Sequence, residues 1–235
     1  MLRRVNATIL MFSLAGCVSV SDTQPATPTP SAPEPAKPAY PAAWFAPLSP
    51  DVKPYSWEIT PDAAAPGEVI LSKRNELGIL SNFAATPFEL DGKRYGSLEG
   101  FWQAMYYPEG ADDPRQEVVP KRLTREQVEQ LASFEAKKAG DDAKKALRQA
   151  AIAWISYRGH RFDPHGSEED RQFHYDLIIR ATRAKVEQNA EVKRILLATG
   201  DLVLKPDHEQ VKDATPAWRY FDILTALRAD LRRAP

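Results

Sequence analysis

The densest group of residues that could do chemistry lies in two short stretches, Leu80-Ser-Asn-Phe83 and Leu98-Glu-Gly-Phe-Trp-Gln103. A single carboxylate, Glu99, falls in the first turn of a predicted helix, among large aromatic and apolar residues. Such surroundings raise the pKa of a carboxyl group, which can then act as an acid or a base. The residues alone leave open a simpler interpretation, in which Glu99 only complements the positive end of the helix dipole.

Other kinds of site find little support in the sequence. None of the four histidines has a His or Cys partner at the spacing of a metal site: His160, His165, His174 and His208. The chain lacks a Walker loop, a Gly-x-Ser-x-Gly motif and a Gly-x-Gly-x-x-Gly motif. Its net charge is −1, with 31 basic and 32 acidic residues and no sustained basic stripe. We therefore expect no metal, no cofactor and no general nucleic-acid binding.

The elements that must position these residues are mostly helices. Apolar spacing, N-cap residues and prolines predict six of them, at about 97–107, 124–140, 141–154, 167–188, 189–200 and 215–232. A strand is predicted at 68–71, a hairpin over 87–95 with its turn at Asp91-Gly92, and an extended piece at 202–204. Residues 158–166 are predicted to form a polar loop. The expected fold class is α+β, mainly α-helical, with a small N-terminal β element and about six helices.

The first residues are typical of an export signal. Arg3 and Arg4 precede an apolar stretch of about seven to ten residues, which is too short to cross a bilayer as a permanent helix. Leu14-Ala-Gly-Cys17 resembles a bacterial lipobox, and Cys17 is the only cysteine in the chain. We therefore predict a signal peptide at 1–16, a lipid anchor on Cys17 and, since Val18 is not an aspartate, an outer-membrane location facing the periplasm.

A proline-rich segment follows the predicted anchor. Prolines interleaved with Ala, Thr and Ser favour extended, polyproline-like conformations, so residues 17–67 are predicted to be a tether to a domain at 68–235. Four aromatic residues near its end, Trp44, Phe45, Tyr55 and Trp57, interrupt this composition. Docking of these aromatics on the folded domain is the favoured interpretation, and contact with another surface is the alternative.

Several stretches of the domain, in order, resemble the NADAR family. They are Gly78-Ile-Leu-Ser-Asn-Phe-Ala-Ala, Phe88-Glu-Leu-Asp-Gly-Lys-Arg-Tyr, Ser97-Leu-Glu-Gly-Phe-Trp-Gln-Ala-Met, Glu135-Ala-Lys-Lys-Ala-Gly140, Arg183-Ala-Lys-Val-Glu-Gln and the closing Ile223-Leu-Thr-Ala-Leu-Arg-Ala-Asp-Leu. The family pattern reads L-S-N-F, then a D-G hairpin, then a helix with E-H-x-[YF]-Q-A. The resemblance covers about residues 68–232.

The resemblance implies an N-glycosidase, which hydrolyses the bond between a ribose anomeric carbon and a base nitrogen. The small-molecule substrate would be a ribosylated or ADP-ribosylated compound. Glu99 stands at the position of the family's catalytic glutamate. The residues expected to bind the substrate are Asn82, Phe83, Trp102, Gln103, Lys137 and Glu209.

Three departures from the family pattern accompany the resemblance. The histidine after the glutamate is replaced by Gly100, where we expect a ligand to approach the backbone closely. No tryptophan precedes the Arg-Ala-Lys helix, and the late D-x-x-W-G segment is replaced by Pro206-Asp-His-Glu-Gln210, which leaves Asp207 or Glu209 as candidate carboxylates. The alternative function is therefore a catalytically inactive domain that binds a nucleotide, another ligand or a partner at the cell envelope.

Overall fold

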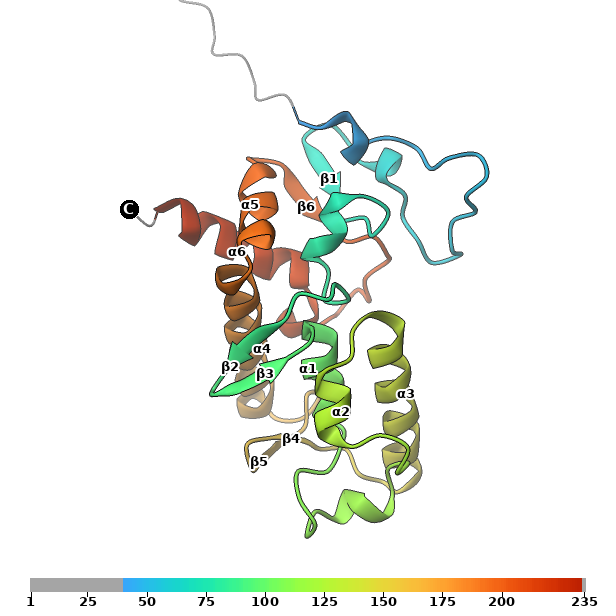
Figure 1. Ribbon diagram of the computed structural model, residues 1–235, viewed down its shortest axis with the longest axis vertical. Helices are drawn as coiled ribbons and strands as arrows, with labels where there is room; N and C mark the ends of the chain where they lie inside the picture. The colour runs from blue at the N-terminus through green and yellow to red at the C-terminus, as the bar shows by residue number, and fades with distance from the viewer. Residues whose placement is uncertain (1–39, 234–235) are drawn as a thin grey trace, which may run out of the picture. The chain divides into compact units, whose positions relative to one another are not determined.

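The computed structural model describes residues 40–233, and Figure 1 shows their arrangement. The predicted fold class is confirmed, because six α-helices dominate and the strands are short. The predicted signal peptide and Cys17 lie outside the described residues. The helices are α1 (Leu98–Ala104), α2 (Arg125–Glu129), α3 (Ser133–Gln149), α4 (Glu168–Gln188), α5 (Ala190–Ala198) and α6 (Tyr220–Arg233).

The strands pair into three two-stranded sheets rather than one β element. Strand β1 (Glu68–Ile70) runs parallel to β6 (Val203–Lys205), so chain segments far apart in sequence meet beside α5 and α6 (Figure 1). The predicted hairpin is β2 (Phe88–Leu90) with β3 (Lys93–Tyr95). Its turn residues Asp91 and Gly92 both have positive φ, 52° and 78°, as a tight hairpin requires.

The third sheet corrects the prediction of a loop at 158–166. Strands β4 (Ile155–Tyr157) and β5 (His160–Phe162) form an antiparallel hairpin. Its turn, Arg158-Gly159, again has positive φ at both positions, 52° and 81°. Arginine is an unusual first residue for such a turn, and this is why the residue types at 158–159 do not predict a hairpin.

The prediction that Gly140 ends a helix is wrong. Helix α2 is only five residues long, and α3 runs through Gly140 to Gln149. The predicted N-caps at Ser97, Thr124 and Ser167 are confirmed, since each side chain accepts a hydrogen bond from a backbone amide of the first turn. A glycine inside a helix weakens it, so Gly140 needs a reason from packing.

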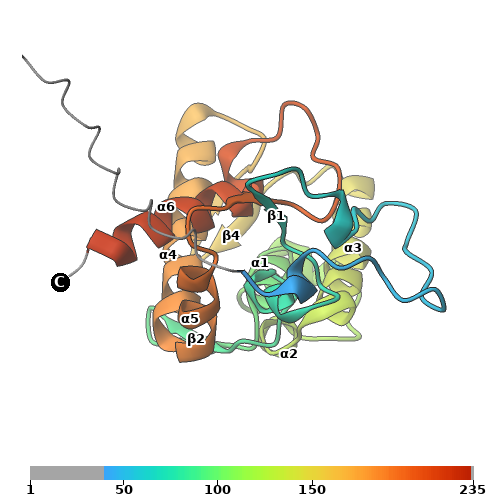
Figure 2. The same cartoon turned by 90° about the horizontal axis from the view of Figure 1, so that it is seen from above.

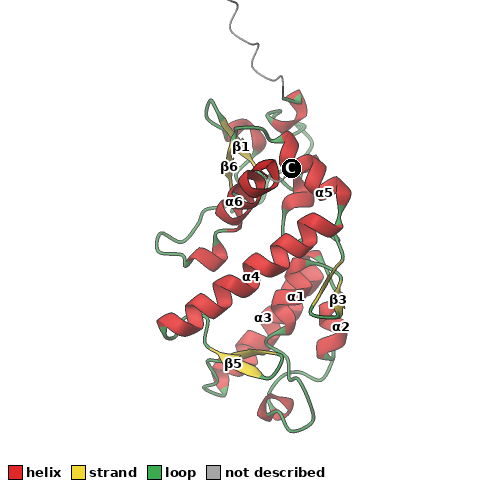
Figure 3. Ribbon diagram, turned by 90° about the vertical axis from the view of Figure 1, so that its left-hand side faces the viewer, coloured by secondary structure: helices red, strands yellow, loops and turns green. Residues whose placement is uncertain are grey.

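Helix α4 crosses the fold in front of α1 and α3 in the view of Figure 3. Its residues enter two separate apolar clusters. Leu177 and Ala181 pack with the aromatic residues of α1 and the hairpins, whereas Val186 packs with α5, α6 and β1. The helix therefore joins the two cores. None of the helices described between residues 40 and 233 has both the length and the apolar character that crossing a membrane requires.

The N-terminal arm, defined here as residues 40–66, packs on the same body as the helices. Trp44 is 1% exposed within the core beside Leu77 and Val192, and its indole nitrogen donates a hydrogen bond to Glu76. Docking of Trp44 is thus confirmed. Tyr55 and Trp57 stay 53% and 42% exposed, on the loop that extends towards α3 in Figures 1 and 2.

Candidate active site

Glu99 lies in the first turn of α1, one residue after Leu98 and two after the N-cap Ser97. Its amide nitrogen donates a hydrogen bond to the carbonyl of Asn82 at 3.0 Å, which ties the helix to the 81–83 loop. The residue is only 7% exposed. Burial raises the pKa of the Glu99 carboxyl group, although a hydrogen bond from Gln103 and the charges of Lys144 and Lys137 oppose the shift. A carboxyl group in this state can both hold and release a proton.

Gln103 lies one helical turn after Glu99 and orients its carboxyl group. The side-chain nitrogen of Gln103 donates to Glu99 Oε1 at 2.7 Å. Its amide group faces α3 at Gly140, where an added Cβ would lie 1.7 Å from Gln103 Oε1. Only a glycine at position 140 leaves room for this amide, and this close approach explains a glycine in the middle of α3.

One cavity of about 990 Å³ collects the residues that the sequence singled out. Its volume is at the upper end of the range of ligand pockets. All seven predicted catalytic and binding residues line it, from α1, the 81–83 loop, α3 and the segment before α6: Asn82, Phe83, Glu99, Trp102, Gln103, Lys137 and Glu209. Their individual roles remain predictions, but the structure brings them to one place.

The expectation that a ligand approaches the backbone at Gly100 is wrong. Gly100 does not line the cavity; it faces the other side of α1. A Cβ there would lie 2.4 Å from the carbonyl oxygen of Leu131 and 2.9 Å from that of Val128. The backbone that approaches Gly100 is therefore that of α2 and the residues after it, and no ligand is involved. A histidine at this position would collide with that backbone.

The stretch at 206–210, which replaces the missing family motif, and the residues that follow it up to α6 still form a wall of the cavity. Glu209 and Trp218 both line it, and Trp218 packs edge-on against Trp102 with ring centroids 4.7 Å apart. His174 of α4 stacks on Trp102, with the two ring centroids 4.5 Å apart. Burial lowers the pKa of His174 to about 3, so this ring is neutral and serves as packing.

Asp207 lies behind the cavity wall rather than in it. Its carboxylate is 1% exposed, forms an ion pair with Lys73 and accepts a hydrogen bond at 3.0 Å from the ring of His208. Burial alone raises the pKa of Asp207, but the bonds from His208 and Lys73 outweigh it and the net shift is downward. Asp207 is thus an ionised residue that holds Lys73 and His208 at the cavity surface.

Sequence reasoning missed several residues of this cavity. Lys73, Lys144 and Trp57 line it but stand outside the motifs that carried the family resemblance. Two further carboxylates line it as well, Glu58 and Asp213, so Glu209 is not alone in this role. Glu58 is already engaged by Arg74 through two bonds of 2.7 Å. The aromatic residues of the arm were the one sequence signal that could have indicated that the arm contributes to this cavity.

Lys185, from the Arg-Ala-Lys stretch, supports the site from behind. It is fully buried on α4 and donates a hydrogen bond of 2.6 Å to the carbonyl of Ser81. Burial lowers the pKa of its amine to about 7. Together with the bond from the Glu99 amide to the Asn82 carbonyl, this contact pins the 81–83 loop between α4 and α1.

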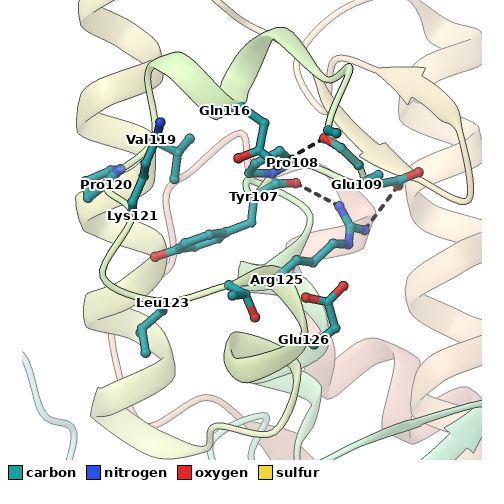
Figure 4. Close-up of a pocket in the computed structure, with 13 residues that line it drawn as sticks. Tyr107, Pro108, Glu109, Gln116, Val119, Pro120, Lys121, Leu123, Arg125 and Glu126 are labelled. Atoms are coloured by element: carbon teal, nitrogen blue, oxygen red, sulfur yellow. Dashed lines mark hydrogen bonds and ion pairs between the residues drawn. The ribbon is translucent and has the colours of Figure 1, made fainter.

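A second, smaller cavity of about 400 Å³ lies under the loop before α2 (Figure 4). Arg125, one of the charged residues that line it, donates to the carbonyl of Tyr107 at 2.9 Å and pairs with Glu109 at 3.3 Å, and both interactions are drawn in the figure. The guanidinium group is thus occupied in holding the loop together. Within residues 40–233 there is no group of three or more His, Cys, Asp or Glu side chains placed to hold a metal ion.

Comparisons with known proteins find sequence similarity to proteins that carry one enzyme name. No family model matches the chain. The N-glycosidase YbiA of Escherichia coli strain K12 is 30% identical over 129 residues, which are 54% of this chain and 61% of that protein. The protein of the same name from Shigella boydii serotype 4 is 29% identical over 129 residues, with the same coverage. The chain therefore matches less than two thirds of the length of these relatives.

The ordered motifs and these relatives agree on one family. They support a divergent NADAR-like domain over the part of the chain that they match. A solution structure of the Escherichia coli YbiA protein aligns with a TM-score of 0.41 and 23% identity, over 68% of this chain and 82% of that one. In this NADAR-like domain, the cavity that contains Glu99 is the candidate active site.

A Gly140→Ala substitution tests the packing that orients Gln103. Alanine in a helix interior otherwise stabilises a protein by about 1 kcal/mol relative to glycine. Here we expect the added methyl to displace Gln103 and lower the free energy of unfolding by about 1–3 kcal/mol in chemical denaturation. Gly110→Ala is the control, because nothing lies within 4 Å of a Cβ there. Equal effects of the two substitutions would contradict the packing argument.

A pH series on Lys185→Met tests the buried amine. Because the pKa of Lys185 is lowered to about 7 in the folded state, the unfolded chain binds more protons between pH 7 and about pH 10. Stability of the original protein should therefore rise with pH in this window, with a contribution from Lys185 of up to about 1.4 kcal/mol per pH unit. Lys185→Met should remove that contribution, and substitution of the exposed Lys138 by Met should leave it. Parallel stability curves for all three proteins would exclude a neutral Lys185.

Proposed function

We propose that the NADAR-like domain is an N-glycosidase that acts on a ribosylated or ADP-ribosylated small molecule. The observation that carries the proposal is the buried carboxyl group of Glu99, oriented by Gln103 in the same cavity as Asn82 and Phe83. Its relatives from Escherichia coli and Shigella boydii are both named N-glycosidases, which supports the same class of reaction.

In the proposed reaction, water adds to the anomeric carbon of the ribose while the bond to the base nitrogen breaks. One proton of the water passes to Glu99, which returns it to the leaving nitrogen, so that free base and free ribose are formed. Negative charge at Glu99 stabilises the oxocarbenium-like transition state. The raised pKa of Glu99 suits a group that must both accept and return a proton. Asn82 would contact the ribose, and Phe83 and Trp102 would pack against the base.

Three lysine side chains at the cavity support a substrate that carries phosphate. Lys73, Lys137 and Lys144 all line it. Lys137 forms an ion pair with Asp141 at 2.7 Å, and Lys73 one with Asp207, so each is held in a defined place. Ammonium groups fixed in this way attract an anionic ligand to the cavity.

Glu99→Gln tests the catalytic assignment. We expect it to lower kcat/KM for base release by a factor of about 10²–10⁴, since it removes the acid–base group but keeps the side-chain shape. The assay measures free base by chromatography, after the purified full-length chain is incubated with a ribosylamine phosphate or an ADP-ribosylated guanine nucleoside. Glu135→Gln is a matched control, because Glu135 also lies in the first turn of a helix but is exposed and does not line the cavity.

Three outcomes are informative. Equal turnover by Glu99→Gln and the original protein would remove Glu99 from the mechanism. Loss of activity in both variants would indicate a general effect on folding, which the unfolding curves of the two proteins would reveal. No turnover by the original protein on either substrate would overturn the proposed activity.

We further propose that the chain is exported and anchored to the cell envelope through Cys17. The lipobox-like sequence, the single cysteine and the short apolar stretch before it support this proposal. An envelope location with the domain in the periplasm implies a substrate that is available outside the cytosol.

Cys17→Ser tests the anchor. In a bacterium that processes lipoproteins, the full chain should incorporate a labelled fatty acid and sediment with the membranes, whereas Cys17→Ser should lose the label and stay uncleaved. Ser21→Ala is the control, because it changes a nearby polar residue and leaves the cysteine in place. A fatty-acid label on Cys17→Ser equal to that of the original chain would contradict the anchor.

A further inference from the structure

The exposed apolar surface of the described residues is concentrated at the mouth of the active-site cavity. Trp57, Phe134 and Val211 are 42%, 50% and 78% exposed, and all three line the cavity. Tyr55 is 53% exposed and lies against two of them. Large aromatic groups left open to water beside a cavity mark a binding surface.

The rings at this mouth form one continuous group. We call Tyr55, Trp57 and Phe134 the rim cluster. Tyr55 stacks on Trp57 with centroids 5.2 Å apart and an interplanar angle of 5°, and it tilts against Phe134 at 6.4 Å. Phe134 packs edge-on against Phe83 at 5.1 Å. The rim cluster therefore leads from solvent to the 81–83 loop, which contacts Glu99.

The arm holds its part of the rim cluster in a fixed position. The backbone of Glu58 forms an antiparallel bridge with His208, and the amide of Ile59 donates to the carbonyl of Asp207 at 2.8 Å. The Glu58 carboxylate binds the guanidinium of Arg74, which lies 5.1 Å from the ring of Tyr55. A binding surface fixed before the ligand arrives does not lose further conformational entropy when it binds.

A cation accompanies these rings. The ammonium group of Lys73 lies 5.7 Å from the centroid of Trp57 and 5.3 Å from that of Phe83. Its ion pair with Asp207 keeps it there. The mouth of the cavity thus offers aromatic faces and a fixed positive charge together, which is the combination that binds a nucleobase attached to a phosphate.

We infer that the rim cluster is a second base-binding subsite, distinct from the place of the base that is cleaved off. It would take the nucleobase of a nucleoside that is joined through phosphates to the ribose held at Glu99. This inference rests on the proposed function and narrows it to substrates with a distal nucleotide, and Trp57 is the residue that selects them. The cavity volume of about 990 Å³ leaves room for such a two-part ligand.

Binding without turnover tests the subsite. The probes are ADP-ribose, which carries a distal base, and ribose 5-phosphate, which lacks one, and their Kd values for the purified full-length chain are measured by calorimetry. We expect ADP-ribose to bind at least about tenfold more tightly, because stacking on one aromatic side chain supplies a factor of this size. Trp57→Ala should remove the difference, Trp57→Phe should retain part of it, and Val203→Ala should leave it unchanged. Val203 is the control because it is 55% exposed but lies outside the cavity.

The inference is overturned if the original chain binds both probes equally or binds neither at millimolar concentration. It is also overturned if Trp57→Ala weakens both probes by the same factor, since the arm would then have only a structural role. Binding of a neutral oligosaccharide such as cellotriose that depends on Trp57 would assign the rim cluster to sugar rings instead. These results do not depend on hydrolysis, so failure of the proposed activity with a retained preference for ADP-ribose would leave the subsite intact.

Discussion

The candidate site depends above all on the loop at 81–83 being held from two sides through its own carbonyl groups. On one side the amide of Glu99 donates to Asn82, and on the other the buried amine of Lys185 donates to Ser81. These two bonds connect α1 to α4, the helix that joins the two apolar cores. The position of the Glu99 carboxyl group relative to Asn82 and Phe83 follows from this connection.

The same arrangement places two ionisable groups in apolar surroundings with little compensation. Glu99 has one hydrogen-bond donor, Gln103, and Lys185 has one acceptor, Ser81. Burial penalises the charged form of each, so the pKa of the acid is raised and that of the amine is lowered. Because the pKa of Lys185 is lowered to about 7, the amine holds the loop with less than a full positive charge from about this pH upward. A positive charge there would favour ionised Glu99 and weaken its ability to hold a proton.

Local signals in the sequence predicted much of the fold because they do not depend on distant contacts. N-caps at Ser97 and Thr124 and the Asp91-Gly92 turn are examples. Where the reason for a residue lies in another element, the prediction failed. Gly140 looked like the end of a helix because the helix pattern cannot show that Gln103 lies against it. Gly100 looked like a place for a ligand because the sequence cannot show that the carbonyls of α2 approach it.

For the candidate site, too, the sequence predicted the residues that lie close together in the chain and missed those brought in from distant segments. The motif residues around Glu99 line one cavity, because α1 and the 81–83 loop are close in sequence and linked by a backbone bond. Lys73 and Trp57 were missed, because their position depends on Asp207 and His208, about 130 to 150 residues further along the chain. Pairing between segments so distant leaves no local pattern.

Docking of the arm also shortens the chain that would separate a lipid anchor at Cys17 from the folded domain. The sequence assigns residues 17–67 to a tether, but residues 40–66 belong to the folded body and Trp57 lines the cavity. Under the proposed anchor at Cys17, only the residues from 17 to 39 separate the lipid from the arm. Fully extended, a chain of that length spans about 80 Å at most. Residues 17–39 would then set how far the domain can reach from the membrane, while Tyr55 and Trp57 of the docked arm form part of the rim cluster.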